Sequence, residues 1–122
     1  MTPIESAVHA AIATVCPRVY PVLAPIRTTR PYVTVQNIGG RPIYSIDRAP
    51  ADKRMLRFFI KTWASSKVEA LTLMRLVEQT LMAVPMTTFI ARVESEPLDD
   101  IETDVEPWLY SEQQEFMVIG PR

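Results

Sequence analysis

Three stretches of this chain alternate apolar and polar side chains at every second residue, and this period constrains the fold most. They are Tyr32–Ile38 (YVTVQNI), Met55–Trp63 (MLRFFIKTW) and Trp108–Ile119. A period of two is typical of β-strands that bury one face. The second of these stretches predicts a long hairpin with a basic outer face, formed with the strand that precedes it, Arg41–Ile46. In the third, the middle from Ser111 to Glu115 is polar on both faces, which indicates an edge, a bulge or a partner contact.

Two segments show the helical period instead. Thr2–Val15 begins with a capping-box pattern and a proline at the first helical position. Ser66–Val84 has a second capping box, and Pro85 ends it. The apolar positions of this second helix predict one core-facing stripe: Val68, Leu71, Met74 or Arg75, Val77, Leu81 and Val84.

Shorter signals complete the order of elements. Phe89–Val93 is a short predicted strand, and Arg41–Ile46 is a further strand after a turn at Gly39-Gly40. The proline-rich segment from Pro17 to Pro31 is predicted as an extended loop, which leaves open a short strand at Arg18–Tyr20 outside this order. Asp47–Lys53 is a polar hairpin tip. The order α-β-β-β-α-β-β predicts an α+β two-layer sandwich, a mostly antiparallel β-sheet with two helices on one face.

The totals fit one domain over residues 1–122. A chain of this length buries enough surface to fold without a disulfide or a metal, and Cys16 is its only cysteine. The N-terminal segment lacks the basic and long apolar parts of a signal peptide. No stretch approaches the roughly 18 apolar residues that a membrane helix needs.

The net charge of −1 conceals an asymmetry between two parts of the chain. Residues 1–93 hold 12 basic and 5 acidic residues, a net +7, whereas residues 94–122 hold 1 and 9, a net −8. Such a split indicates contacts that depend on charge, or two solvated surfaces that neutralise each other within one fold.

The acidic residues gather in the run from Glu94 to Glu106, which could be a metal site, a disordered tail or a connector. Its alternating acids resemble half of a calcium loop, but Val105 stands where the sharp-turn glycine belongs. A two-metal nuclease draws its carboxylates from separate rigid elements. Because a predicted strand follows the run, we expect a connector between the last two strands, with no metal and no cofactor.

Other chemistry finds little support in the sequence. Gly39-Gly40 is the only glycine pair, so there is no phosphate-binding loop. His9, the one histidine, lies about two helical turns from Cys16 and could not easily serve it as a base. The basic hairpin with Tyr44 and Phe59 could bind a single nucleic-acid strand. The pI near 5.8 argues against an obligate nucleic-acid binder.

Three stretches, in order, resemble one protein family. Its N-terminal signature, an exposed loop leading into a strand, is similar to RVYPVLAP (Arg18–Pro25) followed by RPYVTVQNIGG (Arg30–Gly40). Its central strand, Trp-Ala junction and long helix are similar to RFFIKTWASSKVEALTLMRLVEQTL (Arg57–Leu81). Its closing acidic passage is similar to DVEPWLYSEQQEFMV (Asp104–Val118). The family is the tail-completion or tail-terminator proteins of long-tailed phages, of the tail-to-head joining type.

The resemblance implies a non-enzymatic virion protein, assembled in the bacterial host cytoplasm. Such proteins form a hexameric ring that caps the tail tube, ends its growth and presents a surface to the neck of the head. The implied partners are further copies of the chain, the tail tube protein and a head-completion protein. DNA would pass through without sequence-specific binding. Family members often carry a basic pair where this chain has Ser111-Glu112.

These expectations single out two groups of charged residues. We expect the acids Asp99, Asp100, Glu102 and Asp104 to meet Arg54, Arg57 or Lys61 of a neighbouring subunit, or else to line the opening of the ring. The alternatives are another neck, connector or minor tail protein on a similar fold, and a small metal-dependent enzyme that uses the acidic loop.

Overall fold

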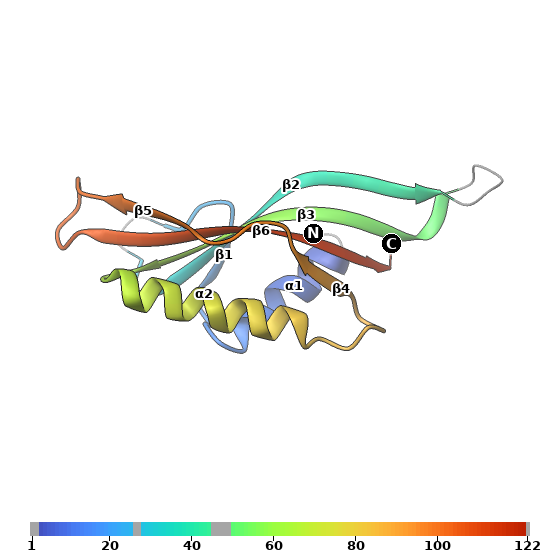
Figure 1. Ribbon diagram of the computed structural model, residues 1–122, viewed down its shortest axis with the longest axis horizontal. Helices are drawn as coiled ribbons and strands as arrows, with labels where there is room; N and C mark the ends of the chain where they lie inside the picture. The colour runs from blue at the N-terminus through green and yellow to red at the C-terminus, as the bar shows by residue number, and fades with distance from the viewer. Residues whose placement is uncertain (1–2, 26–27, 45–49, 122) are drawn as a thin grey trace.

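The computed structural model describes residues 3–25, 28–44 and 50–121, which form two helices and one six-stranded sheet (Figure 1). Along the chain the elements are α1 (Pro3–Ala13), β1 (Val19–Pro21), β2 (Tyr32–Tyr44), β3 (Pro50–Ala64), α2 (Lys67–Met82), β4 (Ile90–Val93), β5 (Leu98–Glu102) and β6 (Leu109–Pro121). The predicted α+β class is confirmed. None of the described helices has the length and apolar character to cross a membrane.

The sheet order is β1-β2-β3-β6-β4, and β5 pairs with the other half of the same edge of β6. Among the strands of the described residues, β1 and β2 run parallel, and the other pairings are antiparallel. Both helices lie on one side of this sheet, and β2 and β3 extend as a hairpin well beyond the helices (Figure 1).

The core lies between the helices and this face of the sheet, and the alternating pattern explains it. On β3, Phe58 and Ile60 are 1% and 0% exposed, and on β6 Phe116 is fully buried against them. Helix α1 adds the apolar side chains of Val8 and Ile12, which are fully buried. Every second side chain of these strands therefore points toward the helices, and it packs there against the apolar stripe that the helical period creates.

Helix α2 begins as the sequence predicts. Ser66 is its N-cap, and its hydroxyl oxygen accepts a hydrogen bond from the Glu69 N–H at 3.1 Å. The predicted stripe needs a correction, because Val68 is 75% exposed. The buried stripe starts instead at Ala70, whose carbonyl accepts a hydrogen bond from the buried Thr62 hydroxyl at 2.9 Å. The small alanine lets the first turn of α2 approach β3 closely.

The predicted turn at Gly39-Gly40 is wrong. Both glycines have positive φ, 103° and 155°, but they lie inside the continuous strand β2, where the pairing with β3 shifts between Asn37 and Gly40. The pair therefore forms a β-bulge, in which glycine provides the backbone freedom that a turn would also need. The predicted tip at Asp47–Lys53 is partly wrong as well, since β3 already begins at Pro50. Thr2, Ile46 and residues 47–49 lie outside the described residues.

Two expectations about the last third of the chain are also wrong. The acidic run is not a plain connector, because Leu98–Glu102 forms β5 and pairs with β6 in the register Asp99 to Glu112. Strand β6 is not an edge, because β3 flanks it on one side and β4 and β5 flank it on the other. Its polar middle is therefore partly buried, with Glu112 and Gln114 each 1% exposed.

Candidate functional site

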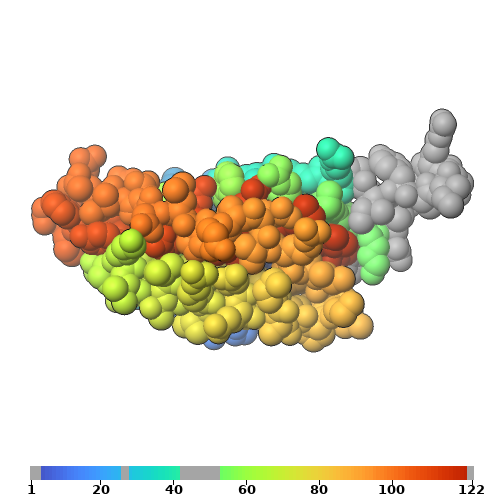
Figure 2. Space-filling view, viewed as in Figure 1, coloured from blue at the N-terminus to red at the C-terminus, as the bar shows by residue number. Residues whose placement is uncertain are grey.

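Strand β5 carries three of the four predicted acidic site residues: Asp99, Asp100 and Glu102. All five residues of the strand are exposed, and Asp104 is exposed in the segment that follows. In Figure 1 this strand lies at one end of the long axis, and the β2–β3 hairpin lies at the other. The orange acidic segment also forms that end of the surface in the space-filling view (Figure 2). The structure thus gathers the acids at one pole of the molecule.

Two of these acids already meet cations of the same chain. Lys67, in the first turn of α2, places its Nζ 2.8 Å from the Asp99 carboxylate, and Lys61 on β3 lies 3.9 Å from Asp100. The hydrogen bond from Lys67 lowers the pKa of Asp99 and raises the pKa of Lys67 itself. Both side chains are exposed, so the pair is of the kind that contributes little to stability.

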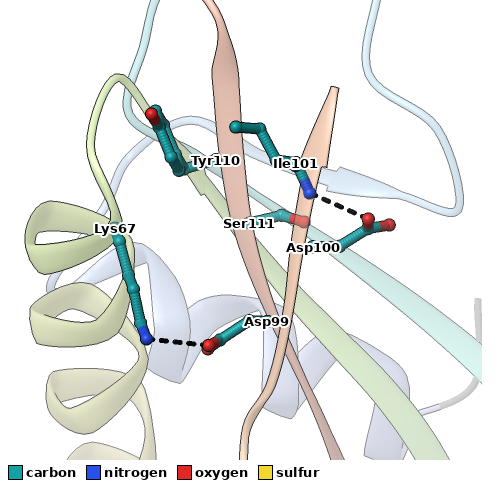
Figure 3. A pocket seen from close by; sticks show the side chains of 6 residues that line it. All are labelled: Lys67, Asp99, Asp100, Ile101, Tyr110 and Ser111. Carbon is teal, nitrogen blue, oxygen red and sulfur yellow. Dashed lines mark hydrogen bonds and ion pairs between the residues drawn. The ribbon is translucent and has the colours of Figure 1, made fainter. Parts of the chain in front are cut away.

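A hollow of about 320 Å³ lies between this strand and the start of α2. Its lining comes from α2, β5 and β6: Lys67, Asp99, Asp100, Ile101, Tyr110 and Ser111. In Figure 3 Lys67 and Asp99 point toward each other, whereas Asp100 turns away and accepts a hydrogen bond from the Ile101 N–H at 2.8 Å. The only cation of the lining is therefore occupied by an ion pair.

The predicted basic site residues all lie on β3 but in different surroundings. Arg54 is half-buried near the hairpin, and Arg57 is exposed and forms an ion pair with Glu115 of β6. Lys61 sits 4.3 Å above the centre of the Trp63 ring, where the ring face attracts its charge. The structure therefore does not bring the three together into one basic cluster.

An aromatic cluster on the helix-free face of the sheet was not predicted. Trp63 stacks on Tyr32 with ring centres 5.8 Å apart and planes at 13°, and Tyr20 meets Tyr32 edge-on at 6.4 Å. The Trp63 Nε1–H donates a hydrogen bond to the Thr34 hydroxyl at 3.2 Å. The register of Tyr32 opposite Trp63 creates the stack, and the alternation of the two stretches contained that signal.

A second unpredicted feature is a buried polar pair on β6. Neither carboxylate oxygen of Glu112 and neither polar atom of the Gln114 amide has a hydrogen-bond partner among the described residues. Burial, followed by the facing Asp99, raises the pKa of Glu112 to about 7. An acid buried in this way favours its neutral form near neutral pH.

The described residues offer little for metal or nucleophilic chemistry. No group of three or more His, Cys, Asp or Glu side chains among them could hold a metal ion. Cys16 is buried, with its sulfur 3.8 Å from the carbonyl oxygens of Arg18 and Pro31. A thiol buried in this way is typical of a structural cysteine.

Comparison with known proteins adds no family or function. No protein-family model and no curated protein matches the chain. A solved structure whose title gives only a sequence identifier aligns over 93% of this chain and 89% of its own, with 11% identity and a TM-score of 0.43. That likeness is too weak to carry an argument about function.

Proposed function

We propose that the protein is a non-enzymatic structural protein of a long-tailed phage, which caps the tail tube as a ring, terminates tail growth and forms the joining surface for the head. The proposal starts from the resemblance of three ordered stretches, between Arg18 and Val118, to tail-terminator proteins. The protein would be located in the virion, at the head-proximal end of the tail. Its partners would be other copies of itself, the tail tube protein and a neck protein.

The observation that carries the proposal is the placement of opposite charge at opposite ends of the molecule. The acidic pole holds β5, and the hairpin at the other end holds Arg41, Lys53 and Arg54 (Figure 1). A ring needs head-to-tail interfaces, in which two different surfaces of neighbouring subunits meet. Complementary charge on two distant surfaces favours such a contact over a contact between identical surfaces.

Tails assembled without the protein test the proposal directly. Overlong tails without heads, in negative-stain images, would support termination by this protein. Purified protein added back should then restore joining to heads. Tails of normal length that fail to join heads would point to a neck or connector protein instead. Normal tails that join heads would refute both roles.

A charge-swap experiment tests the interface. Arg54→Glu should prevent ring formation on tail tubes, and adding Asp104→Arg in the same chain should restore it, because the acid and the base exchange places. Arg92→Glu is the matched control: it makes the same charge change at an exposed site on β4. If Arg92→Glu abolishes rings as completely as Arg54→Glu does, the effect is one of net charge, and the proposed interface is wrong.

The four acids can also be neutralised together, as Asp99→Asn, Asp100→Asn, Glu102→Gln and Asp104→Asn. Loss of rings would assign these residues to the subunit interface. Intact rings with slower DNA passage would assign them to the opening, where negative charge repels the phosphate backbone. Unchanged rings and unchanged passage would leave the acids as a solvated surface.

A further inference from the structure

Strand β5 is weakly attached to the rest of the molecule. Its five residues are all exposed, so the strand buries no side chain of its own in the core. It is held by its ladder to β6 and by the ion pairs of Asp99 with Lys67 and of Asp100 with Lys61. Exposed edge strands of this kind lie at the low end of local stability in a fold.

Directly beside this strand, on β6, lies the buried Glu112. The pairing register sets Asp99 opposite Glu112, so the two carboxyl groups are a cross-strand pair on one face of the sheet. Like charges directly opposite each other destabilise a β-ladder. A buried carboxylate with no hydrogen-bond partner is also costly. The neutral form of Glu112 removes both penalties, and its O–H can then donate to the Asp99 carboxylate.

The other elements around Glu112 do not remove these penalties. Helix α2 offers Lys67 and Arg75, but Lys67 is already paired with Asp99, and Arg75 is paired with Glu78 and lies 3.9 Å from Glu96. Strand β3 sets the uncharged Thr62 opposite Glu112. The Thr62 hydroxyl donates its hydrogen bond to the Ala70 carbonyl of α2 and not to Glu112. Strand β4 pairs with β6 only further along, from Phe116 to Ile119.

We infer that β5 is a proton-controlled latch: it is docked on β6 while Glu112 holds a proton, and it is released when Glu112 loses that proton. Release separates the two carboxylates and admits water to Glu112. It also exposes the backbone hydrogen-bonding groups of β6 from Leu109 to Gln113, which β5 otherwise covers. The raised pKa of Glu112, about 7, places this change near neutral pH. The inference does not depend on the proposed role in a phage tail.

The size of the effect follows from proton linkage. Docked Glu112 titrates near 7, and a released Glu112 titrates near its ordinary pKa of 4.5. The equilibrium constant for release should therefore rise about tenfold between pH 6 and pH 8. Asp99 does not contribute in this window, because its pKa is lowered below 3.8.

Hydrogen exchange of the intact protein, corrected for the intrinsic pH dependence of exchange, tests the latch. In the wild type, the protection of β5 and of the facing part of β6 should fall about tenfold from pH 6 to pH 8. Protection in β4, which pairs with the same edge of β6, should not change. In Glu112→Gln, whose neutral amide can donate to Asp99 as the protonated acid does, β5 should stay protected at both values.

Direct titration of the Glu112 side chain by carbon NMR keeps the inference testable if the variant does not fold. A midpoint near 7, together with the loss of β5 protection, supports the latch. A midpoint near 4.5 overturns it. Equal pH dependence of β5 in the wild type and in Glu112→Gln overturns it as well, and so does a parallel loss of protection in β4, which would mean global unfolding.

Discussion

Gly40→Ala is the substitution for which the structure gives the sharpest expectation. A Cβ atom built at Gly40 would lie 2.1 Å from the Met55 carbonyl oxygen and 2.8 Å from the Leu56 Cα. Both contacts are with the backbone of β3, which cannot swing aside as a side chain can. Gly39→Ala is the matched control, since a Cβ there meets nothing within 4 Å while φ is also positive, at 103°.

The two costs can be separated. Gly39→Ala should cost only the backbone strain of a positive φ, about 1–2 kcal/mol. Gly40→Ala adds the clash with β3, which demands a shift of more than an ångström in one strand and disrupts the bulge. Overpacking of this kind costs about 1–3 kcal/mol more, giving a total of about 2–5 kcal/mol. At about 4 °C per kcal/mol, the expected losses in Tm are about 4–8 °C for Gly39→Ala and about 8–20 °C for Gly40→Ala.

Thermal unfolding followed by circular dichroism, with denaturant melts at 25 °C, measures both variants against the wild type. The loss should be at least twice as large for Gly40→Ala as for Gly39→Ala. Equal losses would mean that the bulge relaxes freely, and the close approach of β2 to β3 would then not explain the glycine. A Gly40→Ala protein as stable as the wild type would refute the reasoning altogether.

Other predictions concern the cap, the core and the buried acid. Ser66→Ala removes the N-cap acceptor of α2 and should lower the free energy of unfolding by about 1 kcal/mol in denaturant melts. Phe116→Ala opens a cavity at a fully buried site and should cost about 3–5 kcal/mol in the same assay. For Glu112, the pKa with β5 docked lies above the pKa of the released state, so the stabilisation of β5 docking is full below pH 4.5 and is lost as pH rises through 7. Hydrogen exchange should show this loss in β5 and the facing part of β6, and it should be absent from Glu112→Gln.

The sequence predicted the elements that are fixed by local periods and caps. Ser66 begins α2, and the alternation of Met55–Trp63 is β3, because these signals depend only on nearby residues. The hairpin into β3 was predicted as well, but the sequence divided β2 into two strands at Gly39-Gly40. The bulge at Gly39-Gly40 could not be told from a turn, because both use the positive φ that glycine adopts easily. They differ only in whether the residues after Gly40 continue the same strand or reverse its direction.

The features that decide the candidate site depend on pairing between distant segments. Leu98–Glu102 (LDDIE) is poor in β-forming residues and is a strand only because β6 offers it a ladder. The same pairing sets Asp99 opposite Glu112, which the sequence placed only in a polar stretch and which the fold buries. Alternation predicted that Glu112 shares a face with Phe116, but it could not show that α2 and β5 would close over it.

The charge asymmetry of the chain is partly cancelled inside the fold. Each internal ion pair that joins the basic part to the acidic part removes one charge from both: Lys67 with Asp99, Lys61 with Asp100, Arg57 with Glu115, and Arg75 with Glu96. Exposed pairs contribute only about 0–1 kcal/mol each, so they do not hold the fold together. Their effect is to neutralise the middle of the molecule and part of the acidic pole.

Some of the charges that remain lie toward the two ends. Glu102 and Asp104 form no ion pair within residues 3–25, 28–44 and 50–121, and neither does Lys53 or Arg54 near the hairpin. A two-fold contact between identical acidic surfaces would set like charges against each other, and so would one between two basic hairpins. A contact between the acidic pole of one subunit and the hairpin of the next sets opposite charges together. Such a contact repeats from subunit to subunit, and it closes into a ring where the rotation allows.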